Sequence, residues 1–448
     1  MIKRRGFPKI FFGWWTVLAA GTLSFWVGGY HFYGISALFK PIASELGFSR
    51  AATSVATGIG RLEGGLEGPV GGWITDRFGP RWIVFVGIFL VGLSLILMNY
   101  IDSLWGFYIV WGVVLGTGHN ISTTVPCDKA ITEWFVKKRG IALGIKWTLT
   151  GLGGVLVLPL IAWLIATQGW RITCVIGGMV MWFVGLPLVW FFVRRHRPEY
   201  YGLLPDGASV EEETPNTGQM IDRGVKYAAE VQEMEFTLRQ TMRTPAYWLL
   251  LVAFSCYGLV GPSLTIHMIP LLTDMGINPV RAAGMLAMMV LITLPLRIIG
   301  GFLADRVKKQ HLRFLLGGGY LLQSLGITIF VLNQTIPMIY AFFILYGIGM
   351  GMAYGITHPL MPRYFGRKAF GSIRGFQNLL MTPVAVIAPI YVGWVYDTTS
   401  SYITAFALMA GLMAFAAFIL PLAPPPQATN SDHRYPHNPV NMSRVFWI

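Results

Sequence analysis

The chain has 448 residues, of which 54% are apolar and 12% are charged, against about 25% charged residues in an ordinary soluble domain. So few charged side chains cannot cover a water-facing surface, which excludes soluble multidomain, disordered, collagen-like and coiled-coil proteins. The net charge of +14 comes from short basic clusters between apolar runs. That pattern indicates membrane topology and not nucleic-acid binding. The three cysteines lie in apolar runs without metal-ligand spacing, so we expect no metal, no cofactor and no disulfide framework.

Apolar runs of about 20 residues recur along the chain, each long enough to cross a hydrocarbon core of about 30 Å. The first run follows a basic N-terminus without a small-residue cleavage site, which indicates a membrane helix and not a removed signal. We predict twelve spans, at 12–36, 51–73, 81–100, 104–126, 140–166, 171–193, 245–272, 281–304, 313–332, 336–358, 371–396 and 402–422.

The distribution of lysine and arginine predicts the orientation of these spans. Of the 34 basic residues, 26 lie at the N-terminus, in the loops that follow even-numbered spans, or in the C-terminal tail. The opposite loops contain four. Both termini are therefore predicted to be cytoplasmic.

We expect an all-α protein of the cell (inner) membrane, a monomer with twelve helices in two pseudo-symmetric six-helix bundles. The predicted parts are an N-terminal bundle (1–193), a cytoplasmic central loop (194–243), a C-terminal bundle (244–422) and a disordered cytoplasmic tail (423–448).

The two halves of the chain share an internal repeat at an offset of 229 residues. Five positions are identical between the halves, and Glu45 matches Asp274 with its charge kept. The identical pairs are Pro41 and Pro270, Gly47 and Gly276, Gly72 and Gly301, Asp76 and Asp305, and Arg77 and Arg306. Two like-oriented halves are typical of secondary transporters, whose site lies between the halves near the middle of the membrane.

These residues also resemble a known family. The segment 72–81 (GWITDRFGPR) is similar to the loop 2–3 signature of the major facilitator superfamily, and 301–306 (GFLADR) is its second copy. The segments 134–144 (WFVKKRGIALG) and 198–207 (PEYYGLLPDG) resemble the branch of monocarboxylate transporters and oxalate/formate antiporters. That branch implies transport of small organic anions, often monocarboxylates.

Arg297 is the first candidate for binding an anion. It stands eight residues before Asp305, which places it roughly 12 Å inside the membrane, where a guanidinium needs a partner or a wet cavity. Its planar fork suits a carboxylate, although an ion pair with a glutamate of another helix is the structural alternative. The resemblance implies that this is the substrate-binding arginine of span 8. The family's aspartate one turn earlier is replaced by Thr293, which puts proton symport by that route in doubt.

Two lysines are further candidates for the substrate site. Lys40 ends the first span near the outer mouth, where it either snorkels to water or, as the resemblance implies, takes part in proton and substrate entry. Lys146 lies about 10 Å from the cytoplasmic surface in span 5. It either snorkels or supplies a second cation beside Arg297.

Glu63 and Glu67 in span 2 are candidates for proton coupling. They are one helical turn apart and share a face. A carboxyl group in a low dielectric can exchange protons near neutral pH. The alternatives are a pair with Arg61 or a gating contact. Gly60, Gly64, Gly68 and Gly72 form a period-four stripe on the same helix, which predicts a seam for close helix approach.

Histidines and aromatic residues of the predicted cavity-lining spans complete the candidates. Each is either a substrate or proton contact or a helix-packing group. For proton handling the residues are His31 and His358, and for the substrate they are His119, His267, Tyr30, Tyr33 and Tyr354.

The signature loops are expected to act in conformational change and not in substrate binding. An aspartate near the N-terminus of a neighbouring helix would favour a closed cytoplasmic face through the helix dipole. The residues concerned are Gly72, Asp76, Arg77, Arg81, Asp305 and Arg306.

The resulting hypothesis is a secondary transporter of a small organic anion, either a mono- or a dicarboxylate, coupled to a proton or a counter-anion. Multidrug or sugar efflux by the same fold is the alternative, which Glu67 keeps open. The sequence has no Walker-type phosphate loop and no Gly-x-Ser-x-Gly elbow, and span 4, which contains His119 and Asp128, has no His-x-x-x-His spacing, so we expect neither ATP drive nor an enzyme.

Overall fold

The computed structural model describes residues 10–47, 50–208, 217–229, 235–277 and 279–426. Within these ranges the regular structure is helical and contains no strand. The predicted tail lies outside the described residues beyond position 426, as does the side chain of Lys40.

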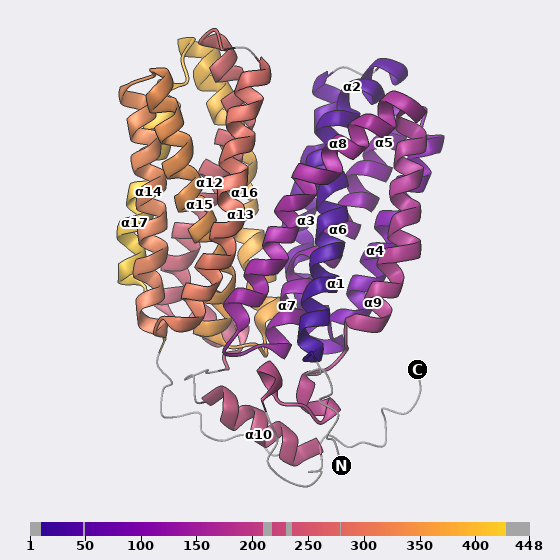
Figure 1. Ribbon diagram of the computed structural model, residues 1–448, viewed down its shortest axis with the longest axis vertical. Helices are drawn as coiled ribbons and strands as arrows, with labels where there is room; N and C mark the ends of the chain where they lie inside the picture. Colours follow the sequence, from indigo (N-terminus) through magenta and orange to yellow (C-terminus); the bar gives the residue numbers. More distant parts are fainter. Residues whose placement is uncertain (1–9, 48–49, 209–216, 230–234, 278, 427–448) are drawn as a thin grey trace, which may run out of the picture.

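The N-terminal half of the chain forms one helical bundle (Figure 1). Its elements are α1 (Phe12–Val27), η1 (Gly28–Gly34), α2 (Ile35–Leu46), α3 (Arg50–Phe78), α4 (Pro80–Leu97), η2 (Met98–Tyr100), α5 (Leu104–Phe107), η3 (Tyr108–Leu115), α6 (Gly116–Thr123), α7 (Val125–Trp134), α8 (Arg139–Val180), η4 (Met181–Gly185) and α9 (Leu186–Phe192).

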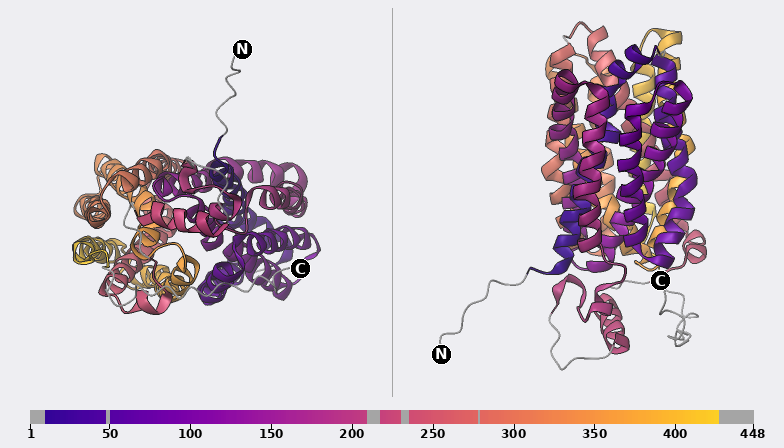
Figure 2. Two further views of the ribbon diagram at one scale, coloured as in Figure 1. Left: turned by 90° about the horizontal axis from the view of Figure 1, so that it is seen from below. Right: turned by 90° about the vertical axis from the view of Figure 1, so that its right-hand side faces the viewer.

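The C-terminal half forms a second bundle beside the first (Figure 2). Its elements are α12 (Pro245–Asp274), α13 (Pro279–Arg306), η7 (Lys309–His311), α14 (Leu312–Leu332), α15 (Ile336–Phe365), α16 (Phe370–Thr399), α17 (Ile403–Ile419) and η8 (Leu420–Leu422). The segment between the bundles contains η5 (Pro198–Tyr201), η6 (Pro205–Gly207), α10 (Thr217–Ala229) and α11 (Leu238–Met242).

The bundles converge at the end of the molecule that carries α10 and diverge toward the end that carries α2 (Figure 1). We call these the α10 end, which the sequence predicts to be cytoplasmic, and the α2 end. Eight helical stretches among the described residues are long and apolar enough to cross a membrane. One of them, Arg139–Phe192, coincides with two predicted spans, because Gly169 (φ 80°, ψ 163°) breaks α8 in a conformation that favours glycine.

Large apolar side chains cover the outside of both bundles. Trp105 and Phe183 of the first bundle are exposed by 75% and 73%, and Leu332 and Phe418 of the second by 80% and 72%. A soluble monomer rarely exposes so much apolar surface, so lipid is the solvent that these surfaces fit.

The glycine stripe of α3 is a seam for close approach, as its spacing predicted. Gly60 and Gly64 face η3 and α6 of the same bundle. Gly68 and Gly72 instead face the backbone of α16 in the other bundle, at Gly375 and Gly371. The same helix therefore packs inside its own bundle along one half and against the opposite bundle along the other.

Three helices of the N-terminal bundle contain wide π-helical turns. These are η1 (Gly28–Gly34), η3 (Tyr108–Leu115) and η4 (Met181–Gly185), each continuous with α-helix on both sides. Such turns insert a residue into the helix and occur frequently at functional sites. The first of them carries Tyr30, His31 and Tyr33, three of the candidate residues.

Candidate functional site

The carboxylate of Asp76 bridges the two bundles at the α10 end. It lies near the end of α3 and accepts hydrogen bonds from the backbone amides of Gly371 (3.0 Å) and Ser372 (2.7 Å) at the start of α16. The Ser372 hydroxyl and the Lys129 ammonium also donate to it, each at 2.7 Å. An anion at a helix N-terminus interacts favourably with the free amides and the helix dipole.

Asp305 makes the corresponding contact in the other half of the repeat. It lies near the end of α13 and accepts bonds from the amides of Gly140 (2.6 Å) and Ile141 (2.8 Å) at the start of α8. Gly301, one turn earlier, lies against Gly140, so the helices cross where neither has a side chain. The two aspartates therefore cap helices of opposite bundles.

The signature arginines contact aromatic rings of their own bundles. Arg77 lies over Trp73 at 5.2 Å, and Arg306 lies over Phe302 at 4.3 Å. Arg81 lies over Trp190 at 4.2 Å and donates to its backbone carbonyl at 2.8 Å. These contacts place the three arginines away from the centre of the bundle interface.

Arg297 lies buried between the bundles with 5% of its surface exposed. Its Nη1 donates to the carbonyl oxygen of Trp147 on α8 at 2.7 Å, and its Cζ lies 4.5 Å from the centre of the Tyr354 ring on α15. Nε has no hydrogen-bond partner among the described residues. The guanidinium thus interacts with a carbonyl and a ring, so part of its hydrogen-bonding capacity is open to an anion.

Aromatic residues of three helices surround this arginine. Trp147 stacks on His358 at 4.1 Å between ring centres and lies 6.2 Å from Tyr354. Tyr33 from η1 lies within electrostatic range of both Arg297 and Tyr354. Two of the predicted tyrosines are thereby brought to the predicted arginine, and Trp147 was not among the predicted residues.

Lys146 lies next to this cluster, but its charge is already paired. Its side chain is 0% exposed, and Nζ lies 3.1 Å from Oδ1 of Asp128 and donates to the carbonyl of Thr123 at 2.7 Å. Oδ2 of the same aspartate lies 3.2 Å from Nδ1 of His358. The ammonium also lies 3.7 Å from the Trp147 ring. Lys146 is close to the arginine cluster, but it forms an ion pair with Asp128 and is not an open second cation.

Glu63 and Glu67 share one partner within the N-terminal bundle. The hydroxyl of Thr117 on α6 lies 2.8 Å from Oε1 of Glu63 and 2.6 Å from Oε1 of Glu67. The second oxygen of each carboxyl group has no hydrogen-bond partner among the described residues. The two acids therefore form one unit on the face that α3 presents to α6.

The remaining histidines and Tyr30 lie in other surroundings. The rings of His31 and His119 lie 4.7 Å apart, and Nδ1 of His119 is 3.2 Å from the Thr123 hydroxyl. Tyr30 is buried inside the N-terminal bundle, where its hydroxyl donates to the Thr173 carbonyl at 3.3 Å. His267 lies beside Tyr402 at 5.6 Å, inside the other bundle.

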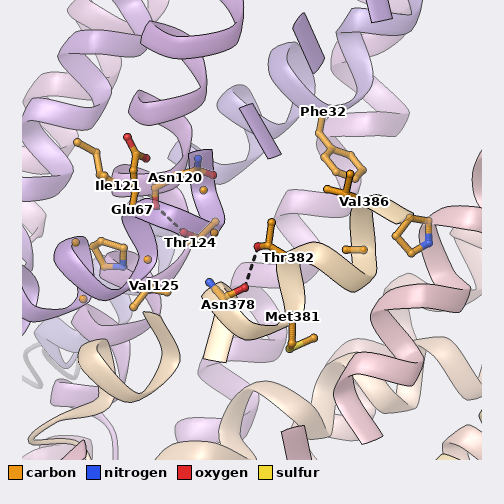
Figure 3. Close-up of a pocket in the computed structure, with 18 residues that line it drawn as sticks. Phe32, Glu67, Asn120, Ile121, Thr124, Val125, Asn378, Met381, Thr382 and Val386 are labelled. Carbon is orange, nitrogen blue, oxygen red and sulfur yellow. Dashed lines mark hydrogen bonds between the residues drawn. The ribbon is translucent and has the colours of Figure 1, made fainter. Parts of the chain in front are cut away.

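A cavity of about 310 Å³ lies between α3, α6 and α7 of one bundle and α12 and α16 of the other (Figure 3). Most of its lining is apolar or glycine. Its polar groups include Glu67, Asn120, Asn378 and Thr382. Arg297 does not line this cavity. It lies at the contact of α13 with α8, which is the counterpart of the α3–α16 contact in the other half of the repeat.

Several charged residues that join the bundles were missed by sequence reasoning. Lys129 is 2% exposed and donates to Asp76 and to the carbonyls of Arg367 (2.8 Å) and Lys368 (2.9 Å) in the other bundle. Arg367 in turn donates to Glu199 of η5 at 2.9 Å. A charged residue within an apolar run was the available signal for Lys129, since such residues are costly without a partner.

The central segment also holds the loop that precedes α8. Asp206 of η6 accepts hydrogen bonds from the amides of Val136 (3.2 Å), Lys137 (2.8 Å) and Lys138 (3.0 Å). Its backbone lies in the left-handed region at φ 61°, which aspartate tolerates better than most residues. The 198–207 motif thus fastens the loop between α7 and α8.

Comparison with known proteins agrees with this geometry. The sequence model of the Major Facilitator Superfamily matches residues 21–389. The chain belongs to the Major Facilitator Superfamily. It is a multi-pass membrane protein, since its relatives are membrane transporters and its helices are long and apolar enough to span a bilayer.

Curated relatives of this superfamily member include transporters of organic anions. It is 25% identical over 386 residues to monocarboxylate transporter 12-B of Danio rerio, covering 82% of this chain and 79% of that protein. It is 26% identical over 300 residues to the oxalate:formate antiporter of Oxalobacter formigenes, covering 66% and 64%. These relatives bear out the resemblance stated from the sequence motifs.

A solved structure shows the same fold. The human organic anion transporter MFSD10 matches with a TM-score of 0.67 at 13% identity, covering 90% of this chain and 99% of that one. At this identity the match supports the all-helical architecture of the superfamily alone.

Proposed function

We propose that this superfamily member is a secondary active transporter that moves a small organic anion, a mono- or dicarboxylate, across the cell (inner) membrane by alternating access. In this proposal the chain crosses the membrane twelve times, with both termini in the cytoplasm, and works as a monomer. Relatives that carry monocarboxylates, or exchange oxalate for formate, support an anionic substrate.

The observation that carries the proposal is the environment of Arg297. A guanidinium that is 5% exposed within an apolar helix is costly unless it has a functional partner. Its described contacts are a carbonyl and the face of a ring, and neither neutralises its charge. A carboxylate delivered between the bundles would supply the missing negative charge through a charge-assisted, bidentate pair.

The contacts at the α10 end support alternating access. The capping aspartates and Lys129 join helices of opposite bundles there. The conformation therefore corresponds to closure of the predicted cytoplasmic face, with the bundles apart toward the other end (Figure 1). Transport would require these bonds to break as the bundles rock about the site.

The coupling ion in this proposal is either a proton or a second anion. Thr293 occupies the position of the family's acid, and its hydroxyl donates to the carbonyl of Val290 at 2.7 Å. Glu63 and Glu67 offer an alternative. One Thr117 hydroxyl proton can be donated to only one of the two carboxylates, so the second short contact requires a proton on the other acid.

Uptake by proteoliposomes tests the function. Labelled lactate, pyruvate, formate, oxalate and succinate would be offered with and without an imposed pH gradient to wild type, Arg297→Ala and Arg281→Ala. Arg281 is an exposed arginine on the same helix and serves as the matched control. We expect uptake of at least one acid that is lost in Arg297→Ala and kept in Arg281→Ala. No uptake of any acid, or uptake indifferent to Arg297, would overturn the assignment.

Efflux of a drug or sugar is the second candidate, and the cavity favours it. The polar groups in the cavity wall include a carboxyl group and neutral amides and hydroxyls, which suit cationic or hydroxylated solutes (Figure 3). Transport of such a solute that is lost in Glu67→Gln and unchanged in Arg297→Ala would support this alternative.

A further inference from the structure

A buried trio of ionisable residues joins the two bundles beside the arginine cluster. Asp128 of α7 and Lys146 of α8 belong to one bundle, and His358 of α15 belongs to the other. The carboxylate lies 3.1 Å from the ammonium and 3.2 Å from Nδ1 of the imidazole, and the three side chains are 4%, 0% and 9% exposed. A buried charge in a membrane protein is rare and costly, so this trio requires a function or a strong structural need.

The trio contacts the residues that hold Arg297. The imidazole of His358 stacks on Trp147 at 4.1 Å, and the backbone carbonyl of that tryptophan accepts the bond from Arg297. Tyr354, whose ring lies beneath the guanidinium, stands one turn before His358 and stacks on it at 6.0 Å. An anion bound to Arg297 would therefore be linked to the imidazole of His358 through one intervening residue, either Trp147 or Tyr354.

The groups around His358 set how strongly it holds a proton. His358 is 9% exposed, and burial by itself disfavours a charged ring. Asp128 of α7 contacts the imidazole, Lys146 of α8 pairs with the same aspartate, and Arg374 of α16 lies within electrostatic range. Arg297 of α13 adds positive charge through its contact with Tyr354. The titratable group that α14 contributes to this region is Tyr320, which lies within range of Arg374 and Tyr354. Because the surroundings carry more positive than negative charge, an anion bound to Arg297 would make a second proton on His358 easier to hold.

The carboxylate also determines which nitrogen takes the proton. Nδ1 of His358 lies 3.2 Å from Oδ2 of Asp128, a contact that favours the tautomer with its hydrogen on Nδ1. The second nitrogen, Nε2, is then the basic one. Uptake of a proton from water at Nε2 converts the ring to an imidazolium that contacts Asp128. Because Lys146 is already paired with that aspartate, the offsetting negative charge is that of the anion at Arg297.

We propose that His358 carries the proton that accompanies the anion and that Asp128 holds it there while the α10 end is closed. This inference rests on the proposed function, and it chooses among the proton-coupling candidates. The described partner of Glu63 and Glu67 is Thr117 of their own bundle. His358 instead contacts an acid of the opposite bundle, so separation of α7 from α15 breaks the contact that stabilises its proton. The imidazolium then gives its proton to the cytoplasm.

Transport assays test this assignment directly. His358→Gln and Asp128→Asn would be compared with wild type in gradient-driven uptake and in anion exchange, which needs no net proton movement. His311→Gln replaces an exposed histidine at the start of α14 and is the matched control. We expect the gradient-driven uptake of His358→Gln to fall at least tenfold more than its anion exchange, and Asp128→Asn to change in the same direction.

Three results would overturn the inference while leaving the proposed function intact. One is full gradient stimulation in His358→Gln. Another is loss of exchange together with gradient-driven uptake, which would indicate that the histidine only positions Trp147 and Arg297. The third is loss of stimulation in Glu67→Gln but not in His358→Gln. If wild type takes up no acid, or if Arg297→Ala takes up as much acid as wild type, the proposed function itself fails.

A second measurement needs no flux across a membrane. Spin labels at Phe78 and Lys368, which are exposed at the α10 end in opposite bundles, report whether that end is closed. The native cysteines are all buried, so the introduced sites would label selectively. Because the proposal has the proton held in the closed, anion-bound state, lowering the pH from 8 to 5.5 in the presence of the transported acid should increase the closed population in wild type and in His311→Gln. The same pH dependence in His358→Gln would contradict the proposal.

Discussion

The α3–α16 crossing gives a quantitative prediction about the closed α10 end. At Gly68 a methyl group in place of hydrogen would lie 2.6 Å from the carbonyl oxygen of Gly375 and 3.3 Å from its carbonyl carbon. Such carbon contacts essentially never fall below 3.0 Å, so the two backbones have to separate by roughly 0.4 Å or more. Backbone atoms cannot rotate away as a flexible side chain can.

The cost falls on the closed state, since it is in that state that α3 lies against α16. Overpacking of this kind costs about 1–3 kcal/mol. That energy corresponds to a shift of about 5- to 150-fold in a two-state equilibrium. We therefore expect Gly68→Ala to move the population toward an open α10 end by a factor in this range.

The assay is the distance distribution between spin labels at Phe78 and Lys368, with Gly58→Ala as the control. Gly58 lies on the same helix, and a methyl group there meets no atom within 4 Å. Both substitutions gain the same helix propensity of about 1 kcal/mol, so that contribution cancels. Identical distance distributions in the two variants would refute the reasoning, because they would mean that the crossing is not strained by a methyl group.

Three further predictions concern charged groups at the ends of the bundles. Asp206→Ala should lower the free energy of unfolding by about 1–3 kcal/mol, because three amides lose their acceptor, and Asp206→Asn should lower it less. Equal melting temperatures for wild type and both variants would count against this prediction. Lys129→Met removes one partner of a buried ion pair, a change that typically costs about 3–5 kcal/mol, so the spin labels at Phe78 and Lys368 should report an opening of the α10 end. An unchanged distance distribution between the labels would contradict this. Glu45 lies beyond the first predicted span, and hydrogen bonds from Arg171 and Trp170 lower the pKa of its carboxyl group below the usual 4.5. Its stabilisation is therefore present above pH 4.5 and lost as the pH falls through the lowered pKa, so Glu45→Gln should melt earlier than wild type at pH 7, and the difference should shrink as the pH falls below 4.5.

The sequence allowed the architecture and part of the site to be predicted. Spacing alone placed Arg297 at depth, because helix rise fixes distance along one element. The approach of α3 to α16 followed from the glycine period, although the identity of the partner helix did not.

The contacts between distant segments could not be predicted in this way. Asp128 and His358 are 230 positions apart and meet across the contact between the bundles, which no local pattern encodes. The same holds for Lys129, whose partners include carbonyl groups that any sequence would supply. Lys146 was recognised as an intramembrane cation, but its pairing with Asp128 depends on how two neighbouring helices of one bundle are rotated.

The wide turn at Gly28–Gly34 has a consequence for the first helix that is separate from rocking of the bundles. Because this turn holds one residue more than an α-helical turn, the side chains on either side of it are out of phase by about 100° compared with an unbroken helix. Tightening of the turn would rotate α2 about its own axis while α1 stays fixed in its bundle. Such a local change of register would turn Tyr33 toward or away from Arg297. In the proposed transporter it would let this half of the helix adapt to the size of the solute.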